Sequence, residues 1–412
     1  MSLIKNSTLN LLGAVLPALI AIPALGYLAR ELDVVLFGVL MLIFAVVGYA
    51  GIFDAGLGKA VVRHTSMNDD GSIQQKLLGT AISFVIVTGS AAAACLYGFS
   101  ALMANSVFNV SDAFFFDTTT AIQIAALCVP FMLMSVILQS YLEGLQKFEL
   151  FNIYRTISGV LVYSIPVLAL LVFNSFKCLM YGLLISRIFS FFIILFIVSK
   201  FSTISKWRFN INMLKELVTF GGWLTVTNII SPLMVYMDRF LIARLVGAQA
   251  VAVYSAPSEL INRMAILPAA ITRAVFPRLA AQSCKVKNKK EKIYALKLML
   301  SLIIPVCLGS YLLARYGIAL WLGEYYANAS ADIFRIMIVG FFFNSVSLIA
   351  YNSLQAKGFS FLTAKIHLCE VIPYAIVLIL MLNVYGLNGA AITWSLRMVV
   401  DCIVMWVFDV RK

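Results

Sequence analysis

The chain carries apolar stretches of about twenty residues, one after another, separated by short polar breaks. A helix of about 20 apolar residues crosses the roughly 30 Å hydrocarbon core of a bilayer. The sequence therefore predicts an all-α integral membrane protein of about twelve transmembrane helices with no soluble domain. The predicted spans cover residues 7–29, 36–58, 77–99, 119–142, 151–173, 178–199, 219–243, 248–277, 297–315, 332–354, 364–384 and 386–408.

The composition agrees with a membrane environment. Of the 412 residues, 62% are hydrophobic and 12% are charged, against roughly 45–50% and 25% in an average soluble domain. Several prolines lie inside the apolar stretches, where packed membrane helices tolerate them. A membrane β-barrel would instead show segments of about ten residues with alternating polarity. The 7 cysteines are scattered, so we interpret them as packing residues rather than as metal ligands or disulfides.

The net charge of +13 is unevenly distributed among the loops. Lysine and arginine gather in alternate loops, which the positive-inside rule assigns to the cytoplasm together with both termini. The basic run from Lys285 to Lys292 is therefore predicted to anchor against anionic lipid headgroups. Membrane lipids are expected partners, and nucleic acid is not.

A weak internal repeat divides the chain in two. Leu28–Arg30 ends the first span as Ile242–Arg244 ends the seventh, and the offset of about 214 residues also relates Phe37–Val39 to Val251–Val253. We therefore predict two six-helix bundles in parallel orientation, residues 1–205 and 206–412. Repeats of this kind are typical of alternating-access carriers, because two similar bundles can rock about a central site.

Ionisable residues inside the spans are the candidate functional groups. A charge at the bilayer centre costs about 2.5–3.5 kcal/mol on the insertion scale, so such residues face a partner or a wet cavity. In the eighth span Glu259, Arg263 and Arg273 fall on one helical stripe. Adjacent Asp238 and Arg239 must point in different directions and are expected to find partners on other helices.

Two further carboxylates stand out. Arg397 and Asp401 are four residues apart in the twelfth span, where a structural pair and a functional one are equally compatible with the spacing. Asp54 lies among small residues that permit close helix packing. Packing explains the neighbouring glycines, but it explains the presence of a carboxylate less readily. If Glu259 and Asp401 neutralise their four-residue neighbours, the cations left unpaired in the spans suit an anionic group such as a diphosphate. These are Arg187, Arg273 and Arg335.

Signatures of enzymes are absent from the sequence. There is no phosphate-binding glycine loop, no nucleophile elbow and no cluster of His and Cys ligands. His64 and Asp69 share a spacing that some acyltransferases use, but chance explains it better. A membrane-embedded polysaccharide polymerase or acyltransferase would be expected to show a large outer loop or a catalytic cluster. We therefore predict neither an enzyme nor a cofactor.

The sequence resembles the O-antigen flippase family (Wzx type) of the MATE-like multidrug/oligosaccharidyl-lipid/polysaccharide exporter superfamily over essentially the whole chain. The segments that carry the resemblance are Asn6–Pro17, Tyr49–Arg63, Glu143–Phe148, Asp238–Leu241, Val253–Tyr254, Phe276–Pro277 and Tyr385–Ala391. None of these segments is a catalytic signature, and twelve spans rather than fourteen argue against a lipid II flippase.

The resemblance implies a specific function and a set of site residues. An undecaprenyl-diphosphate-linked oligosaccharide would move from the cytoplasmic to the periplasmic leaflet of a bacterial inner membrane by ion-coupled alternating access. A cationic cleft would bind it through Arg30, Arg63, Arg239, Arg263 and Arg273, with Asp54, Asp238, Glu259, Arg397 and Asp401 in ion coupling or charge pairing. A polysaccharide polymerase and a chain-length regulator are implied partners. A drug and cation antiporter of the same fold is the rival within transport.

Overall fold

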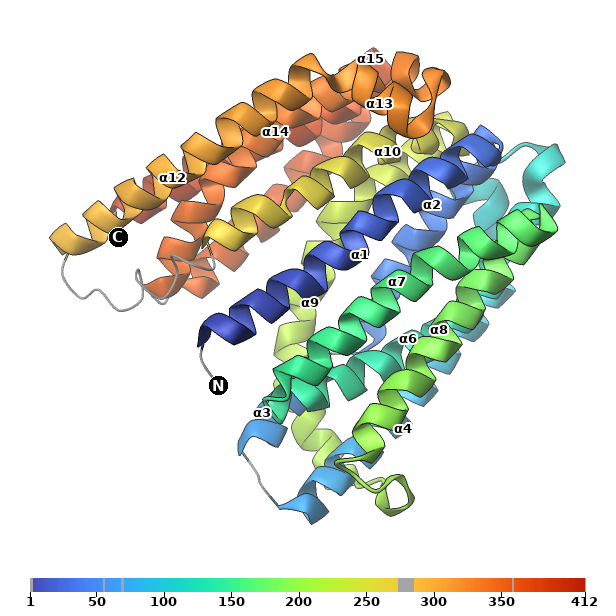
Figure 1. Cartoon of the computed structure of the whole chain (residues 1–412), viewed down its shortest axis with the longest axis vertical. Helices are drawn as coiled ribbons and strands as arrows, with labels where there is room; N and C mark the ends of the chain where they lie inside the picture. Colours follow the sequence, from blue (N-terminus) through green and yellow to red (C-terminus); the bar gives the residue numbers. More distant parts are fainter. Residues whose placement is uncertain (1–2, 55, 68–69, 273–284, 358, 412) are drawn as a thin grey trace. The chain divides into compact units, whose positions relative to one another are not determined.

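The computed structural model describes residues 3–54, 56–67, 70–272, 285–357 and 359–411. The described backbone is helical almost throughout, as the sequence predicted (Figure 1). It divides into two compact units, Met1–Tyr236 and Met237–Lys412, which we describe separately. The bundle boundary at residues 205 and 206, taken from the internal repeat, stays a prediction.

Unit 1 is built from helices that succeed one another with short connections. They are α1 (Leu3–Glu31), α2 (Val34–Tyr49), η1 (Ala50–Asp54), α3 (Leu57–Met67), α4 (Gly71–Gly98), α5 (Ser100–Leu102), η2 (Met103–Val107), α6 (Asp112–Gly144), α7 (Phe148–Phe173), α8 (Phe176–Ser199), η3 (Ile204–Lys206) and most of α9 (Ile211–Val246). Helix α6 packs against α4, α3 and α8, while α7 packs against α8 and α1.

Unit 2 begins with the last turns of α9. It continues with α10 (Ala248–Met264), helical turns over residues 266–272, α12 (Lys285–Leu312), α13 (Ala314–Leu322), α14 (Glu324–Ala356) and α15 (Ser360–Arg411). Helix α14 is central, because it packs against α10, α12, α13 and α15. Gly386 divides α15 into two halves, since its φ of 57° and ψ of −139° are not helical.

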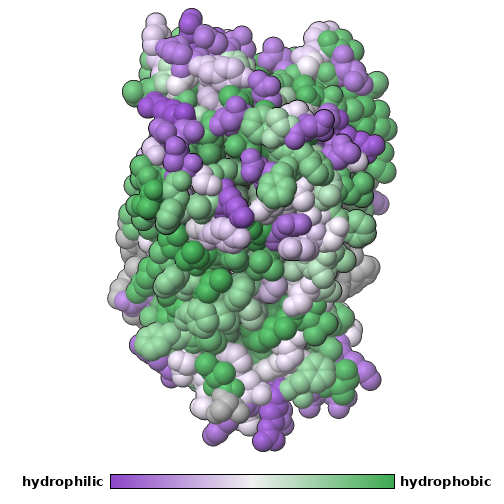
Figure 2. Space-filling view, turned by 90° about the vertical axis from the view of Figure 1, so that its right-hand side faces the viewer, coloured by the Kyte–Doolittle hydropathy of each residue, from purple (hydrophilic) through white to green (hydrophobic). Residues whose placement is uncertain are grey.

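The predicted membrane spans coincide with these helices. Eight helices of the described chain are long and apolar enough to cross a membrane, and one of them is α15 with its two halves. Helices α1 and α9 cover two of the other three predicted spans. The third, 248–277, is described only as far as residue 272, by α10 and the helical turns over residues 266–272. On the face drawn in Figure 2, hydrophobic residues form broad areas of the surface, and hydrophilic residues gather in separate patches among them.

Several helix ends follow directly from local sequence. The Asp33 carboxylate accepts a hydrogen bond of 2.8 Å from the Val35 amide at the start of α2. Asp70 does the same for Ser72 at the start of α4, also at 2.8 Å, and this bond holds the pKa of Asp70 below its usual range. Asn174 ends α7 in the left-handed conformation, with a φ of 43°. Such caps satisfy amides or carbonyls that the helix itself leaves unpaired.

Small residues allow the closest helix contacts. A Cβ on Gly144 of α6 would lie 2.6 Å from the Thr65 Cβ and 2.9 Å from the Val62 carbonyl oxygen of α3. In unit 2, a Cβ on Gly340 of α14 would lie 2.8 Å from the Ser395 Cα of α15. Both contacts leave no room for a methyl group, so these glycines fix the distance between the helix axes.

Candidate functional site

The first polar cluster of unit 2 joins α9 to α10. Arg239 of α9 is 1% exposed and donates a hydrogen bond of 2.8 Å from Nη2 to Oε1 of Glu259 on α10. The Tyr254 hydroxyl of α10 donates a 2.7 Å bond to Oδ2 of Asp238. Asp238 and Arg239 thus both find partners outside α9, as predicted, and both partners lie on the same helix, α10.

Glu259 holds two guanidinium groups at once. Its second carboxylate oxygen lies 3.7 Å from Nη2 of Arg263, one turn further along α10. The predicted polar stripe on this helix is thus present for Glu259 and Arg263, while Arg273 lies outside the described residues. Because the Arg239 bond is shorter and far more buried, Glu259 is primarily the counter-ion of Arg239.

The second polar cluster of unit 2 lies between the two halves of α15 and α14. Nε of Arg397 is 3.5 Å from Oε2 of Glu370, and Asp401 accepts a 2.8 Å hydrogen bond from the Ser347 hydroxyl of α14. Nδ1 of His367 lies 3.7 Å from Glu370 and 3.6 Å from Asp401. The four-residue spacing of Arg397 and Asp401 therefore indicated only part of a larger cluster.

Sequence reasoning missed Glu370 as a member of this site. A signal was present, because Glu370 is an intramembrane carboxylate three residues from His367. Nothing in the sequence, however, indicated that these residues of the eleventh span meet Arg397 and Asp401 of the twelfth. The Arg397 guanidinium also lies 5.3 Å from the centre of the Tyr374 ring, a cation–π distance. Asp238 interacts electrostatically with both Arg397 and Tyr374, so the two clusters are neighbours within unit 2.

The charges of the two clusters do not cancel. Four carboxylates, from Asp238, Glu259, Glu370 and Asp401, face three guanidinium groups among the described residues of the clusters. The ligand atoms of His367, Glu370 and Asp401 lie within 4.8 Å of one another, as a bound cation would require. Both Glu370 oxygens and Oδ1 of Asp401 are buried without a hydrogen-bond partner in the described part of the chain. One proton or one monovalent cation would balance the single excess negative charge.

The remaining candidates belong to unit 1 and lie on separate elements. Arg30 is exposed in the last turn of α1, and Arg63 is exposed on α3. Asp54 ends η1, where its carboxylate accepts a 2.7 Å hydrogen bond from the Gly56 amide. Gly56 has a φ of 71°, which favours glycine. The turn between η1 and α3 thus gives Asp54 a local structural role that the sequence had not suggested.

The cations expected to be unpaired need one correction. Arg335 donates a hydrogen bond of 2.8 Å to Asp332 on the preceding turn of α14, so the expectation that it lacks a partner was wrong. The three-residue spacing on one helix face accounts for the pair. Arg187 lies on α8 and interacts electrostatically with Cys128 of α6 and Tyr154 of α7.

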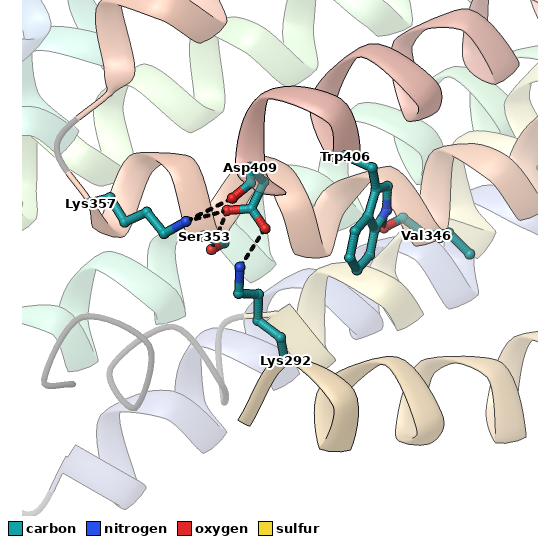
Figure 3. A network of polar contacts seen from close by, with 6 residues as sticks. All are labelled: Lys292, Val346, Ser353, Lys357, Trp406 and Asp409. Carbon is teal, nitrogen blue, oxygen red and sulfur yellow. Dashed lines mark hydrogen bonds and ion pairs between the residues drawn. The ribbon is translucent and has the colours of Figure 1, made fainter. Parts of the chain in front are cut away.

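A third polar network of unit 2, at the C-terminal end of α15, escaped sequence analysis (Figure 3). The fully buried Asp409 carboxylate accepts hydrogen bonds from Lys292 of α12 at 2.6 Å, Lys357 at the end of α14 at 2.8 Å, and Ser353 at 2.7 Å. One turn earlier, the Trp406 indole donates to a carbonyl of α14. This network ties three helices together at one end of the unit.

Comparison with known proteins places the chain among its relatives. Residues 27–331 match the family described as "Polysaccharide biosynthesis protein". The chain belongs to this family. A curated relative from Shigella flexneri, named "Putative O-antigen transporter", is 38% identical over 410 residues, which are 99% of this chain and 98% of the relative. The resemblance to polysaccharide-unit flippases found in the sequence is therefore confirmed.

Solved structures confirm the fold of this polysaccharide biosynthesis protein. A lipid II flippase, MurJ, in an inward closed conformation superposes with a TM-score of 0.81 at 17% identity, covering 99% of this chain and 88% of the flippase. An inward-facing multidrug resistance MATE family transporter of the MOP superfamily superposes with a TM-score of 0.76 at 13% identity, covering 99% and 94%. The chain is thus a multi-span membrane protein with the MATE-like fold.

Proposed function

We propose that the chain is a flippase that moves an undecaprenyl-diphosphate-linked oligosaccharide, a repeat unit of O-antigen or a similar surface polysaccharide, from the cytoplasmic to the periplasmic leaflet. The observation that carries the proposal is the 38% identity, over nearly the full length of both chains, with a protein named as an O-antigen transporter. The membrane would be the bacterial inner membrane, with both termini in the cytoplasm, as the distribution of basic loop residues favours. A polymerase and a chain-length regulator would act on the product.

Arg263 is the group of unit 2 best suited to meet the substrate diphosphate. Its side chain is 24% exposed, and its 3.7 Å distance to Glu259 is longer than the roughly 2.7–2.9 Å of a charge-assisted hydrogen bond. Arg239 is buried and bound closely to the same carboxylate. We therefore assign Arg263 to substrate binding and Arg239 to holding α9 against α10. Arg30 and Arg63 are exposed and stay proposed contacts of the substrate.

Ion coupling would use the second cluster. The excess carboxylate and the closely spaced ligand atoms of His367, Glu370 and Asp401 support uptake of a proton or a cation at this place. Uptake at Asp401 would weaken its contact with Ser347 of α14, and uptake at Glu370 would weaken the contacts that join the two halves of α15. The helix contacts at this cluster would then have two states, with and without the bound ion. The ion gradient would set the populations of the two states and so drive alternating access.

The experiment that tests the flippase proposal is genetic. Deletion of the gene should abolish surface polysaccharide and cause the lipid-linked unit to accumulate, and the wild-type gene should restore the polymer. Arg263→Ala should restore little at matched protein level, because a diphosphate contact is lost. Arg335→Ala is the control, since it removes an arginine paired on its own helix. Undiminished surface polymer in the deletion strain would refute the proposal.

A drug and cation antiporter is the second candidate. The acidic excess of the two clusters suits a cationic substrate, and MATE family transporters share the fold with a TM-score of 0.76. Loss of such an antiporter would sensitise cells to toxic cations and leave surface polysaccharide unchanged. The two measurements on one deletion strain therefore separate the candidates.

A further inference from the structure

A cavity of about 660 Å³ opens between the two halves of α15, wholly within unit 2. Its size lies inside the roughly 300–1,000 Å³ range of small-molecule sites. The side chains that line it are mainly branched and apolar, among them Leu362, Ile366, Leu396, Val400, Val404 and Phe408. Leu396 and Val400 are 49% and 44% exposed, so the groove is open along its side.

The groove follows both halves of α15. Its lining runs from Leu362 to Val377 on one half of α15 and from Thr393 to Phe408 on the other. Fifteen residues at 1.5 Å each correspond to about 22 Å of helix, which is more than half of the roughly 30 Å hydrocarbon core. An extended hydrocarbon chain could therefore lie along it from one leaflet past the midplane. A groove between two helices accommodates one extended chain more readily than the paired chains of a phospholipid.

The charges of the groove favour an anionic headgroup. The charged residues of the lining are Lys365, Arg397 and Glu370, and Nε of Arg397 lies 3.5 Å from Oε2 of Glu370. Lys365 then supplies the remaining charge of the lining, and its side chain is exposed. It lies five residues from the first residue of α15, about 8 Å along the helix from its start. A long side chain of this kind extends its ammonium toward the headgroups.

We propose that this groove binds the single hydrocarbon chain of a prenyl phosphate, with the phosphate group held at Lys365. The proposal deepens the proposed function and rests on it, because the lipid carrier of the oligosaccharide would be recognised by its chain as well as by its diphosphate. The groove would guide the carrier along α15 while the sugar headgroup crosses the membrane.

The test uses the purified full chain in phosphatidylcholine nanodiscs and a prenyl monophosphate with a photoreactive benzophenone at the chain end. Irradiation followed by peptide mapping should place the adducts within residues 362–377 and 393–408. Val400→Trp should remove the adducts by filling the groove. Ile403→Trp is the matched control, since Ile403 is exposed on the same helix and does not line the groove. Lys365→Gln should weaken the apparent affinity about tenfold, as expected for one charge-assisted hydrogen bond.

Competitors decide which lipid the groove prefers. Unlabelled prenyl phosphate should abolish the adducts, whereas phosphatidylglycerol and uncharged prenol at equal concentration should compete at least about tenfold less well. Equal competition by phosphatidylglycerol, or adducts spread evenly over the bilayer-facing helices, would overturn the proposal. Adduct formation can be measured without transport, so the two proposals can fail separately. Adducts without restored surface polymer would count against the flippase function alone. Restored surface polymer without adducts would count against the lipid-binding groove alone.

Discussion

The Asp409 network offers the clearest quantitative test of how unit 2 is held together. Its carboxylate is fully buried, and the ammonium groups of Lys292 and Lys357 on it belong to side chains that are 15% and 22% exposed (Figure 3). Replacing Asp409 by Asn keeps the size of the side chain and one acceptor for Ser353. It removes the negative charge, so two partly buried ammonium groups lose their counter-ion.

The expected loss is large. Removing one partner of a buried ion pair costs about 3–5 kcal/mol, and the lower end applies here because both lysine side chains can turn toward water or headgroups. About 3 kcal/mol corresponds to a drop in melting temperature of roughly 6–12 °C for a unit of 150–250 residues. The measurement is thermal unfolding of the purified protein in detergent.

The matched control is Asp332→Asn in the same unit. Asp332 also binds a cation, Arg335, at 2.8 Å, but its side chain is 71% exposed. Exposed pairs contribute about 0–1 kcal/mol, so this variant should melt within a few degrees of wild type. In a double-mutant cycle, Asp409→Asn with Lys292→Gln should show a coupling of about 1–3 kcal/mol. Equal melting temperatures for the two aspartate variants would show that burial of this network does not contribute to the stability of the protein. Strictly additive effects of Asp409→Asn and Lys292→Gln in the cycle would show the same.

Further predictions concern the packing and the polar cluster. Glu259→Gln removes the charge of the carboxylate that the buried Arg239 binds at 2.8 Å and should lower the unfolding free energy by about 3 kcal/mol. The same melting assay measures this, and unchanged melting would contradict the pairing. Gly144→Leu should strongly reduce folded protein in the membrane fraction, because the side chain meets Thr65, whereas normal yield would mean that α3 moves freely. Asp70→Ala should destabilise the start of α4 at neutral pH. Since the folded pKa of Asp70 is lowered, that difference is present above its unfolded pKa of about 3.9 and should vanish as the pH falls through the folded pKa.

Local sequence determined the helices and part of their chemistry. Apolar stretches of bilayer length predicted the spans, because a helix that crosses hydrocarbon must be apolar along its whole length. The one-residue separation of Asp238 and Arg239 required different partners, and the four-residue spacing of Glu259 and Arg263 predicted their contact. Each of these inferences uses a distance of a few residues, over which helix geometry is fixed.

Only the tertiary structure decided which distant charges meet. Lys292 reaches Asp409 across 117 positions of the sequence, and Arg239 binds Glu259 across 20. Glu370 joins Arg397 because two halves of α15 turn back on each other at Gly386, whose backbone angles no periodicity reveals. The physical reason is that helix periodicity fixes which face a charge occupies. The packing of small residues such as Gly340 against Ser395 fixes which other helix that face meets.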